Sequence, residues 1–200
     1  QLLRSLEAKI ATDAAEIDGE AWIVVLGDVI DRGPSSAQVI DHLMREPPAG
    51  LRRFVLKGNH EAMLVDLARD ARPPAAWLDL GGRETLQSYG VPSRHLEVKL
   101  DARTFAHIVS TFVPKDHLAF LESLPVVIET PSAIFVHAGL QPGVALDQQL
   151  DDDLLWFRDG FAADYKEFGR VVVHGHTPRD VALVTPGRVA LDTGACLSGR

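Results

Sequence analysis

Four short apolar segments of this chain each end just before side chains that can bind a metal ion. The segments have the length and the β-branched composition of buried strands. Segment 22–26 precedes Asp28, and segment 54–56 precedes Asn59 and His60. Segment 134–136 precedes His137, and segment 171–173 precedes His174 and His176. Because strand ends of an α/β sheet meet along one rim, we expect these side chains to form a metal-dependent catalytic site.

The alternation of apolar periodicities along the chain predicts an α/β fold. Strands are expected at 22–26, 53–56, 126–129, 133–136, 170–173, 181–184 and 188–191. Helices are expected at 35–44, 61–69, 84–88, 102–111 and 115–123, the first with Ser35 or Ser36 as its cap. No strand is expected between 71 and 124, which predicts a helical insertion beside the site. The length of 200 residues fits one domain, 1–200.

Both ends of the sequence indicate a trimmed portion of a longer protein. Leu2, Leu3, Leu6 and Ile10 recur at helical spacing, so a helix is expected to include residue 1 without a capping residue before it. Near the other end, residues 191–194 have the pattern of a strand that runs into a turn. We therefore expect trimming at the N-terminus and also at the C-terminus.

The composition excludes several classes of partner. The net charge of −8 repels a phosphate backbone, so general nucleic-acid binding is not expected. No apolar stretch approaches the roughly 20 residues that cross a bilayer. A single cysteine, Cys196, rules out an intramolecular disulfide. We expect a cytoplasmic protein with no membrane partner.

Two short motifs carry most of the candidate chemistry. Residues 27–33 read Gly-Asp-Val-Ile-Asp-Arg-Gly. If Asp28 binds a metal and Arg32 grips a phosphate oxygen bidentately, each charge in this turn has a partner. A turn with a surface Asp–Arg pair is the alternative explanation. Residues 58–61, Gly-Asn-His-Glu, place an amide oxygen beside an imidazole that titrates near neutrality. Two such motifs in this order favour a catalytic site.

Together with His137-Ala138-Gly139 and Gly175-His176-Thr177, these motifs resemble the successive signatures of the calcineurin-like metallophosphoesterases, in the phosphoprotein phosphatase branch. The motifs occur in the family's order and span most of the chain. Further passages, at 81–90, 154–158 and 191–195, resemble bacterial members of that branch. The resemblance implies an α/β fold of the four-layer α/β/β/α sandwich type.

The same resemblance implies a site for two divalent transition-metal ions, with manganese expected and iron or zinc as alternatives. Asp28 is similar to the carboxylate that bridges the two ions, and Asn59, His137 and His176 are similar to the other ligands of the second ion. Such a donor set suits borderline ions better than calcium. The sequence lacks the family's Gly-Asp-x-His-Gly turn, which supplies an Asp and a His to the first ion. We expect that first strand upstream of Gln1.

The resemblance also implies catalytic roles. His60, paired with Asp31, is similar to the general acid that protonates the leaving alkoxide. Arg32 and Arg158 are similar to the arginines that hold the phosphate oxygens. For Arg158 the motif match is looser, and a surface arginine is the alternative.

The function implied by this resemblance is hydrolysis of phosphomonoesters. The leading hypothesis is a serine/threonine phosphoprotein phosphatase, whose partner is a phosphorylated protein or a small phosphoester. One alternative is a symmetrical dinucleoside tetraphosphate hydrolase. Another is a non-catalytic phosphoprotein-binding module, in which Arg32 and Arg158 hold phosphate without turnover.

Overall fold

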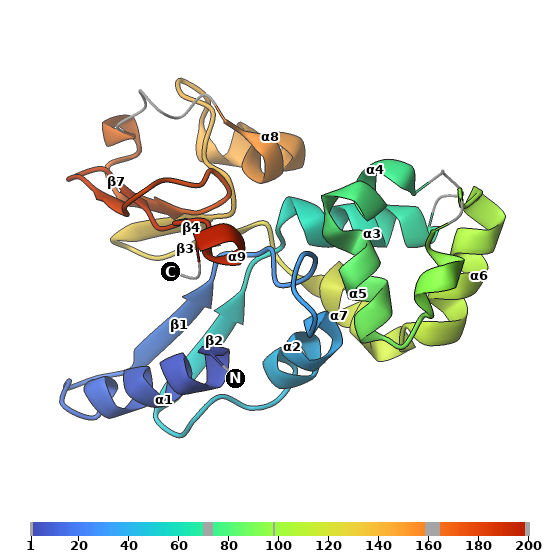
Figure 1. Ribbon diagram of the computed structural model, residues 1–200. Coiled ribbons are helices and arrows are strands. Elements are labelled where there is room, and N and C mark those ends of the chain that lie inside the picture. The colour runs from blue at the N-terminus through green and yellow to red at the C-terminus, as the bar shows by residue number, and fades with distance from the viewer. Residues whose placement is uncertain (1, 70–73, 98, 159–164, 199–200) are drawn as a thin grey trace.

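The computed structural model describes residues 2–69, 74–97, 99–158 and 165–198, so residue 1, expected in the first helix, lies outside it. Within these residues the chain forms two β-sheets with a helical region to one side (Figure 1). Its first elements are α1 (Leu2–Ala14), β1 (Ala21–Val25), α2 (Ser36–Leu43), β2 (Leu51–Val55) and α3 (Asn59–Arg69). β1 and β2 pair in parallel, from Ala21 opposite Leu51 to Val25 opposite Val55.

The second sheet has the strand order β3-β4-β5-β7-β6 in the described part of the chain. Its strands are β3 (Val127–Glu129), β4 (Ala133–Val136), β5 (Val171–His174), β6 (Leu183–Val184) and β7 (Arg188–Ala190). The central strands β4, β5 and β7 run parallel, whereas β3 and β6 pair antiparallel at the two edges. Two short helices accompany this sheet, α8 (Asp151–Trp156) and α9 (Ala195–Ser198). The parallel strands therefore end on the same side, where the sequence predicts the site.

The two sheets face each other. Trp22 of β1 lines a cavity together with Phe135 of β4 and Val173 of β5. Its indole ring lies 4.7 Å from the ring of Phe54, between centroids, on the same face of the first sheet. Because neighbours along a strand point to opposite faces, the alternate residues of each sheet face outward.

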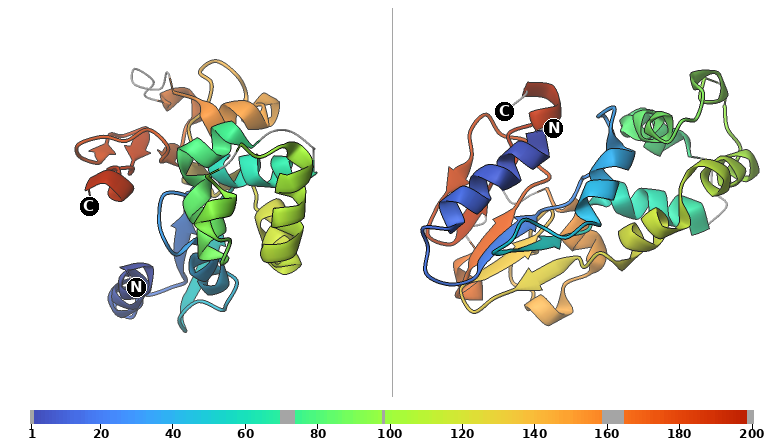
Figure 2. Two further views of the ribbon diagram at one scale, coloured as in Figure 1. Left: turned by 45° about the vertical axis from the view of Figure 1, so that its right-hand side comes forward. Right: turned by 90° about the horizontal axis from the view of Figure 1, so that it is seen from below.

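Helices cover these outward faces. Ile134 and Val172 of the second sheet pack in one core with Leu154 of α8. Val55 of β2 packs in a separate core with Ile40 of α2. Seen from below, the order is helix, sheet, sheet, helix (Figure 2). The four-layer α/β/β/α arrangement implied by the sequence is confirmed.

A buried polar cluster holds α1 on the first sheet. The carboxylate of Glu7 is 2% exposed, accepts a hydrogen bond from Arg53 at 2.7 Å and lies 2.6 Å from His42 Nε2. A buried carboxylate requires such partners to offset its lost hydration. Leu2 and Leu6 of the same helix are exposed, whereas Leu3 packs against the core, so this polar cluster and Leu3 together hold α1.

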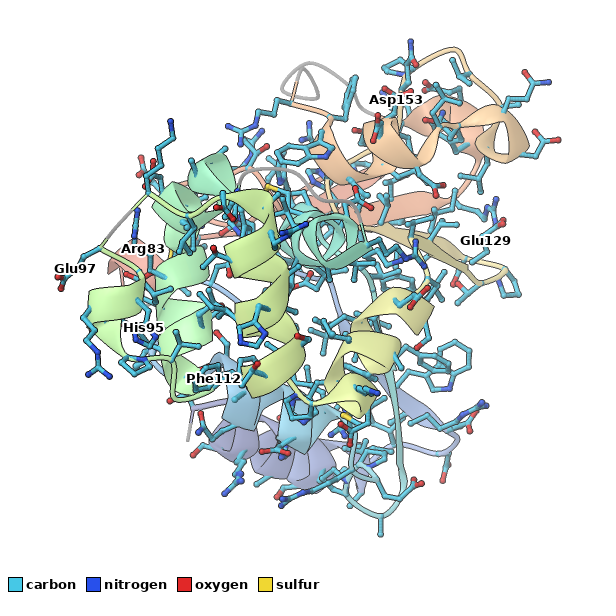
Figure 3. The ribbon with its side chains drawn as sticks, turned by 90° about the vertical axis from the view of Figure 1, so that its right-hand side faces the viewer. Arg83, His95, Glu97, Phe112, Glu129 and Asp153 are labelled. Atoms are coloured by element: carbon cyan, nitrogen blue, oxygen red, sulfur yellow. The ribbon has the colours of Figure 1, made fainter. Side chains whose placement is uncertain are left out.

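Within the described residues 74–97 and 99–124, the predicted insertion contains helices joined by short loops and no strand, while residues 71–73 lie outside the described part. It comprises α4 (Ala75–Trp77), a π-helix (Leu78–Gly82), α5 (Arg83–Ser88), a short turn (Ser93–His95), α6 (Ala102–Phe112) and α7 (Lys115–Ser123). Figure 3 shows this region face on, with Arg83, His95 and Phe112 labelled. Trp77 packs edge-on against Phe105 at 5.8 Å between ring centroids, both buried.

Most expected elements agree with the structure within about two residues, and three details were wrong. The strand expected at 181–184 is reduced to β6, because Val181 is exposed and has no cross-strand pair within the described residues. Residues 75–82, assigned to no element, are helical. Ser35 occupies the N-cap of α2 without a side-chain capping hydrogen bond, and Ser36 bonds to the insertion instead. Among the described helices, none combines the length and apolarity required to cross a membrane.

Candidate metal centre

The first part of the site is a pair of loops in backbone contact. Asp28 follows β1 through Gly27, and Asn59 begins α3 after Gly58. Gly27 has a φ of +93°, and a Cβ there would lie 2.6 Å from the backbone nitrogen of Gly58. Only glycine permits this approach. The close contact sets Asp28, itself at a φ of +53°, beside the start of α3.

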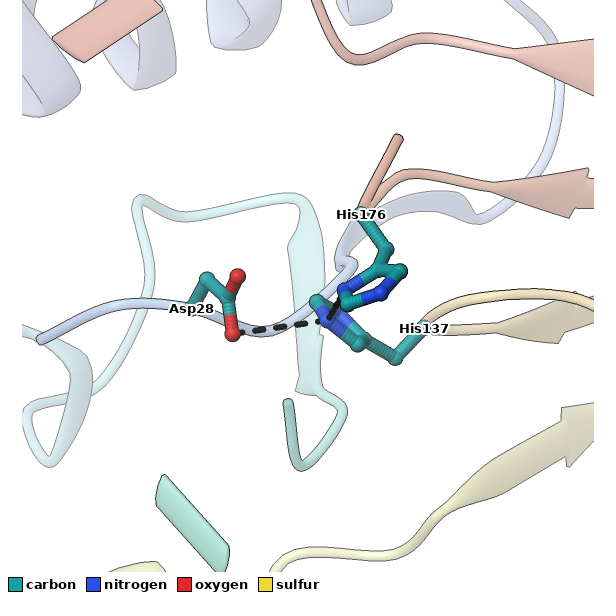
Figure 4. Close-up of side chains that lie close together, drawn as sticks. All are labelled: Asp28, His137 and His176. Atoms are coloured by element: carbon teal, nitrogen blue, oxygen red, sulfur yellow. Dashed lines mark hydrogen bonds and ion pairs between the residues drawn. The ribbon is translucent and has the colours of Figure 1, made fainter. Parts of the chain in front are cut away.

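The second part comes from the other sheet. His137 follows β4 and His176 follows β5, and both turn toward Asp28 (Figure 4). His137 Nε2 lies 2.9 Å from Asn59 Oδ1, 3.1 Å from His176 Nδ1 and 3.4 Å from Asp28 Oδ1. The four side chains that the resemblance assigns to the second metal therefore meet, although Asp28 and His176 lie 148 positions apart in the sequence. The structure brings this whole set together.

The hydrogen bonding of His137 leaves a lone pair directed into this cluster. Its Nδ1 lies 2.6 Å from the carbonyl oxygen of Leu26, which can only accept, so Nδ1 carries the proton. In the neutral imidazole, Nε2 then has no proton to donate to Asp28 Oδ1 or Asn59 Oδ1, which lie 3.4 and 2.9 Å away. Converging acceptors without a hydrogen between them are electrostatically unfavourable unless a cation lies among them. Ligand atoms about 2.1 Å from one ion are themselves about 3 Å apart, as observed here.

His176 is also in the form that binds metals. Burial, with a further contribution from His137, lowers the pKa of His176 to about 4, so its imidazole is neutral at pH 7. Its Nε2 is buried and has no hydrogen-bond partner among the described residues. Neutral imidazole is the ligating form. Two imidazoles with carboxylate and amide oxygens suit a borderline transition metal.

Glu61 is the functional residue that sequence reasoning missed. Its fully buried carboxylate accepts backbone N–H bonds from Gly58 at 2.7 Å, Asp28 at 2.9 Å, Val29 at 2.9 Å and Ile30 at 3.2 Å. It thereby joins the two loops that carry Asp28 and Asn59. Burial and the charge of Asp28 raise the pKa of Glu61 to about 7, and the N–H donors act in the opposite direction.

A signal for this role was present in the sequence. A glutamate three residues after a helix N-cap commonly accepts the N–H of that cap, as one half of a capping box. Gly58 and Glu61 have this spacing and make this bond. The three remaining bonds join Glu61 to a loop more than thirty residues away, which no local pattern indicates.

His60 and Asp31 form a buried pair beside the metal ligands. His60 Nδ1 lies 2.5 Å from Asp31 Oδ2, and both residues are less than a tenth exposed. Burial opposes the charged form of His60, but the hydrogen bond to Asp31 and the charges of Asp28 and Asp31 outweigh it and raise the pKa of His60. Arg32 donates from Nη2 to His60 Nε2 at 3.2 Å. These three residues and the candidate metal ligands Asp28, His137 and His176 line one pocket of about 390 Å³.

Arg158 lies at the edge of this group. It is exposed after the end of α8 and lines a separate depression with Asp152 and Trp156. Its positive charge contributes to the lowered pKa of His176. Its contact with substrate phosphate stays a prediction.

The fold and the converging side chains define a mixed α/β protein with a candidate metal site. The family model for calcineurin-like phosphoesterases matches residues 2–197, and the chain belongs to that family.

Two solved structures share the fold. One is described as a "putative diadenosine tetraphosphatase", with 20% identity, a TM-score of 0.59, and coverage of 95% of this chain and 78% of that chain. The other is a cold-active protein tyrosine phosphatase, with 18% identity, a TM-score of 0.55, and coverage of 90% and 61%. This chain thus spans less than two thirds of the second structure. No curated protein matches the chain.

Proposed function

We propose that this protein is a metal-dependent phosphoesterase that hydrolyses phosphomonoesters, with serine/threonine phosphoproteins as substrates and two divalent transition-metal ions, preferably manganese, as cofactors. The observation that carries this proposal is the convergence of side-chain oxygen and nitrogen atoms of Asp28, Asn59, His137 and His176 in a member of the calcineurin-like phosphoesterase family. Asp28, Asn59, His137 and His176 would hold the second ion, and Asp28 would also contact the first. The ions, when bound, supply Lewis acidity that neutralises phosphate charge and acidifies water.

The chain's own residues then orient the phosphate and supply a proton. The Arg32 guanidinium offers parallel donors to two phosphate oxygens. When it turns to the phosphate it leaves His60 Nε2, to which it donates in this structure. His60, held at Nδ1 by Asp31, can then carry a proton on Nε2 and pass it to the leaving alkoxide.

The His60→Asn variant tests the proton donor. We expect turnover of a phosphoserine peptide to fall by about 10²–10⁴, because an alkoxide is a poor leaving group without protonation. Manganese affinity, measured by calorimetry, should stay near that of the unaltered protein, since His60 lies outside the proposed ligand set. Unchanged turnover would refute the role.

Hydrolysis assays of the complete protein with manganese test the function itself. Phosphoserine and phosphothreonine peptides should be hydrolysed, and a chelator should abolish the activity. Diadenosine tetraphosphate is the competing substrate, because one similar fold carries that description. A higher kcat/KM for the dinucleotide would replace the leading proposal by the dinucleoside tetraphosphate hydrolase.

A binding module without catalysis is the second competing function. Among the described residues, the cluster of Asp28, His137 and His176 could hold one metal ion. The proposed hydrolysis uses two ions, so a site for one ion favours binding without catalysis. Tight binding of a phosphopeptide with no release of phosphate in the presence of manganese would support the module and contradict the enzyme.

A further inference from the structure

In the helical insertion, the side chain of Thr85 reaches the acid–base pair of His60 and Asp31. Thr85 lies on α5, and it is fully buried. Its hydroxyl accepts the backbone N–H of Asp31 at 2.8 Å and lies 2.7 Å from Asp31 Oδ1. Thr85 thus contacts both the backbone and the carboxylate of a residue 54 positions earlier.

The protons of this cluster can be assigned. Asp31 Oδ1 can only accept as a carboxylate, so the hydroxyl hydrogen of Thr85 points to it. Ser36 Oγ lies 3.0 Å from Thr85 Oγ1 and must then be the donor in that contact. Thr85 Oγ1 therefore donates one bond and accepts two. Its hydrogen-bonding capacity is saturated, which fixes its orientation.

The backbone at this point is one that side chains rarely adopt. Asp31 has a φ of +71° and the next residue, Arg32, has a φ of +60°. Such conformations persist where the surroundings impose them. Here the insertion supplies both restraints, because Thr85 binds Asp31 and the carbonyl oxygen of Gly81 accepts the N–H of Arg32 at 3.2 Å.

The restraint determines which carboxylate oxygen faces His60. Thr85 holds Asp31 Oδ1, and the other oxygen, Oδ2, is then directed to His60 Nδ1 at 2.5 Å. We propose that Thr85 is a positioning residue for proton transfer, acting through Asp31 to hold His60 with its Nε2 toward the leaving group. This inference rests on the proposed phosphoesterase function.

The inference predicts a loss that depends on the leaving group. p-Nitrophenolate departs without protonation, whereas a serine alkoxide requires a proton donor. A misplaced His60 should therefore slow hydrolysis of a phosphoserine peptide much more than that of p-nitrophenyl phosphate. A general defect in folding or metal binding would slow both substrates alike.

The experiment compares Thr85→Val, which removes the hydroxyl at nearly constant shape, with Thr85→Ser, which keeps it. For Thr85→Val we expect kcat/KM to fall by about 10–100-fold on the phosphopeptide and by less than about threefold on p-nitrophenyl phosphate. Thr85→Ser should recover most of the loss. Thr111→Val removes a hydroxyl from α6 of the same insertion, away from Asp31, and is the matched control.

Two further measurements establish that Thr85 acts through Asp31. Calorimetry should give an unchanged manganese affinity for Thr85→Val. In an Asp31→Asn background, Thr85→Val should add little further loss, since the group it positions is already altered. If Thr85→Val does not fold, Thr85→Ala is measured in the same way. The ratio of its kcat/KM losses on the phosphopeptide and on p-nitrophenyl phosphate then decides between a positioning role and a structural role.

Three outcomes would overturn the inference. Equal losses on both substrates, full additivity with Asp31→Asn, or failure of Thr85→Ser to recover activity would each make Thr85 a structural residue. Hydrolysis of neither substrate by the unaltered protein with manganese would overturn the proposed function as well. The first group of results leaves the phosphoesterase proposal intact, so the two failures are distinguishable.

Discussion

The Asp28→Asn variant is expected to have a turnover rate at least about 10³-fold lower and to bind manganese at least roughly tenfold more weakly. Changes to residues that only support metal ligands commonly cost about 10–100-fold, so a change to a proposed ligand should cost at least as much. The reason is that Asp28 provides the carboxylate of the ligand set and is the one residue proposed to contact both ions. An amide oxygen keeps the shape but removes the negative charge that attracts a dication. The remaining proposed ligands are an amide and two imidazoles, and imidazole binds metals in its neutral form.

Two measurements check this expectation. Calorimetry gives the manganese affinity directly, and the rise in Tm with added manganese reports it independently, because a ligand that binds the native state stabilises it. Asp18→Asn, at an exposed position before β1, makes the same change of charge and should alter neither quantity. An Asp28→Asn protein with normal manganese binding would contradict the assignment.

The Glu61→Ala variant should lower the free energy of unfolding by more than about 3 kcal/mol without metal, and weaken manganese binding as well. It leaves four backbone N–H groups without their acceptor, and a buried unsatisfied donor costs about 1–3 kcal/mol. Relief of the repulsion between Glu61 and Asp28 offsets part of this cost. Loss of the bonds also releases the loop of Asp28 from the start of α3.

Denaturant unfolding of the metal-free protein measures this effect, with Glu46→Ala as the control. Glu46 is exposed in the turn after α2, and its removal should change stability by less than about 0.5 kcal/mol. Glu61→Gln keeps one acceptor oxygen, so its free energy of unfolding should lie between those of Glu61→Ala and Glu46→Ala. A Glu61→Ala protein as stable as the control would show that the four bonds contribute little.

Much of the fold follows from local patterns. Apolar runs predict β1, β4 and β5 and the end of β2, because a buried strand reads as a continuous apolar segment. The turns that follow are also local, and glycine at 27 and 58 is what their close backbone contact requires. For this reason the residues that follow those strands could be predicted as candidate ligands.

Contacts between distant segments could not be predicted in this way. The bond from Thr85 to Asp31 and the three bonds from Glu61 to the loop at 28–30 join residues 31 to 54 positions apart. The π-helix at 78–82 likewise depends on Gly81, at a φ of +119°, lying against the backbone of Arg32. The local periodicity of the sequence does not predict such packing.

The sequence by itself determined which residues follow the strands, and so named Asp28, Asn59, His60, His137 and His176. Their order resembles one family, to which the chain belongs. Only the tertiary structure decided how these groups are held. His137 presents Nε2 because a carbonyl from β1's end binds Nδ1, and Asp31 faces His60 because the insertion binds its other oxygen. The physical reason is that strand ends are set by local periodicity, whereas tautomers and carboxylate orientations depend on hydrogen-bond partners that folding brings from elsewhere in the chain.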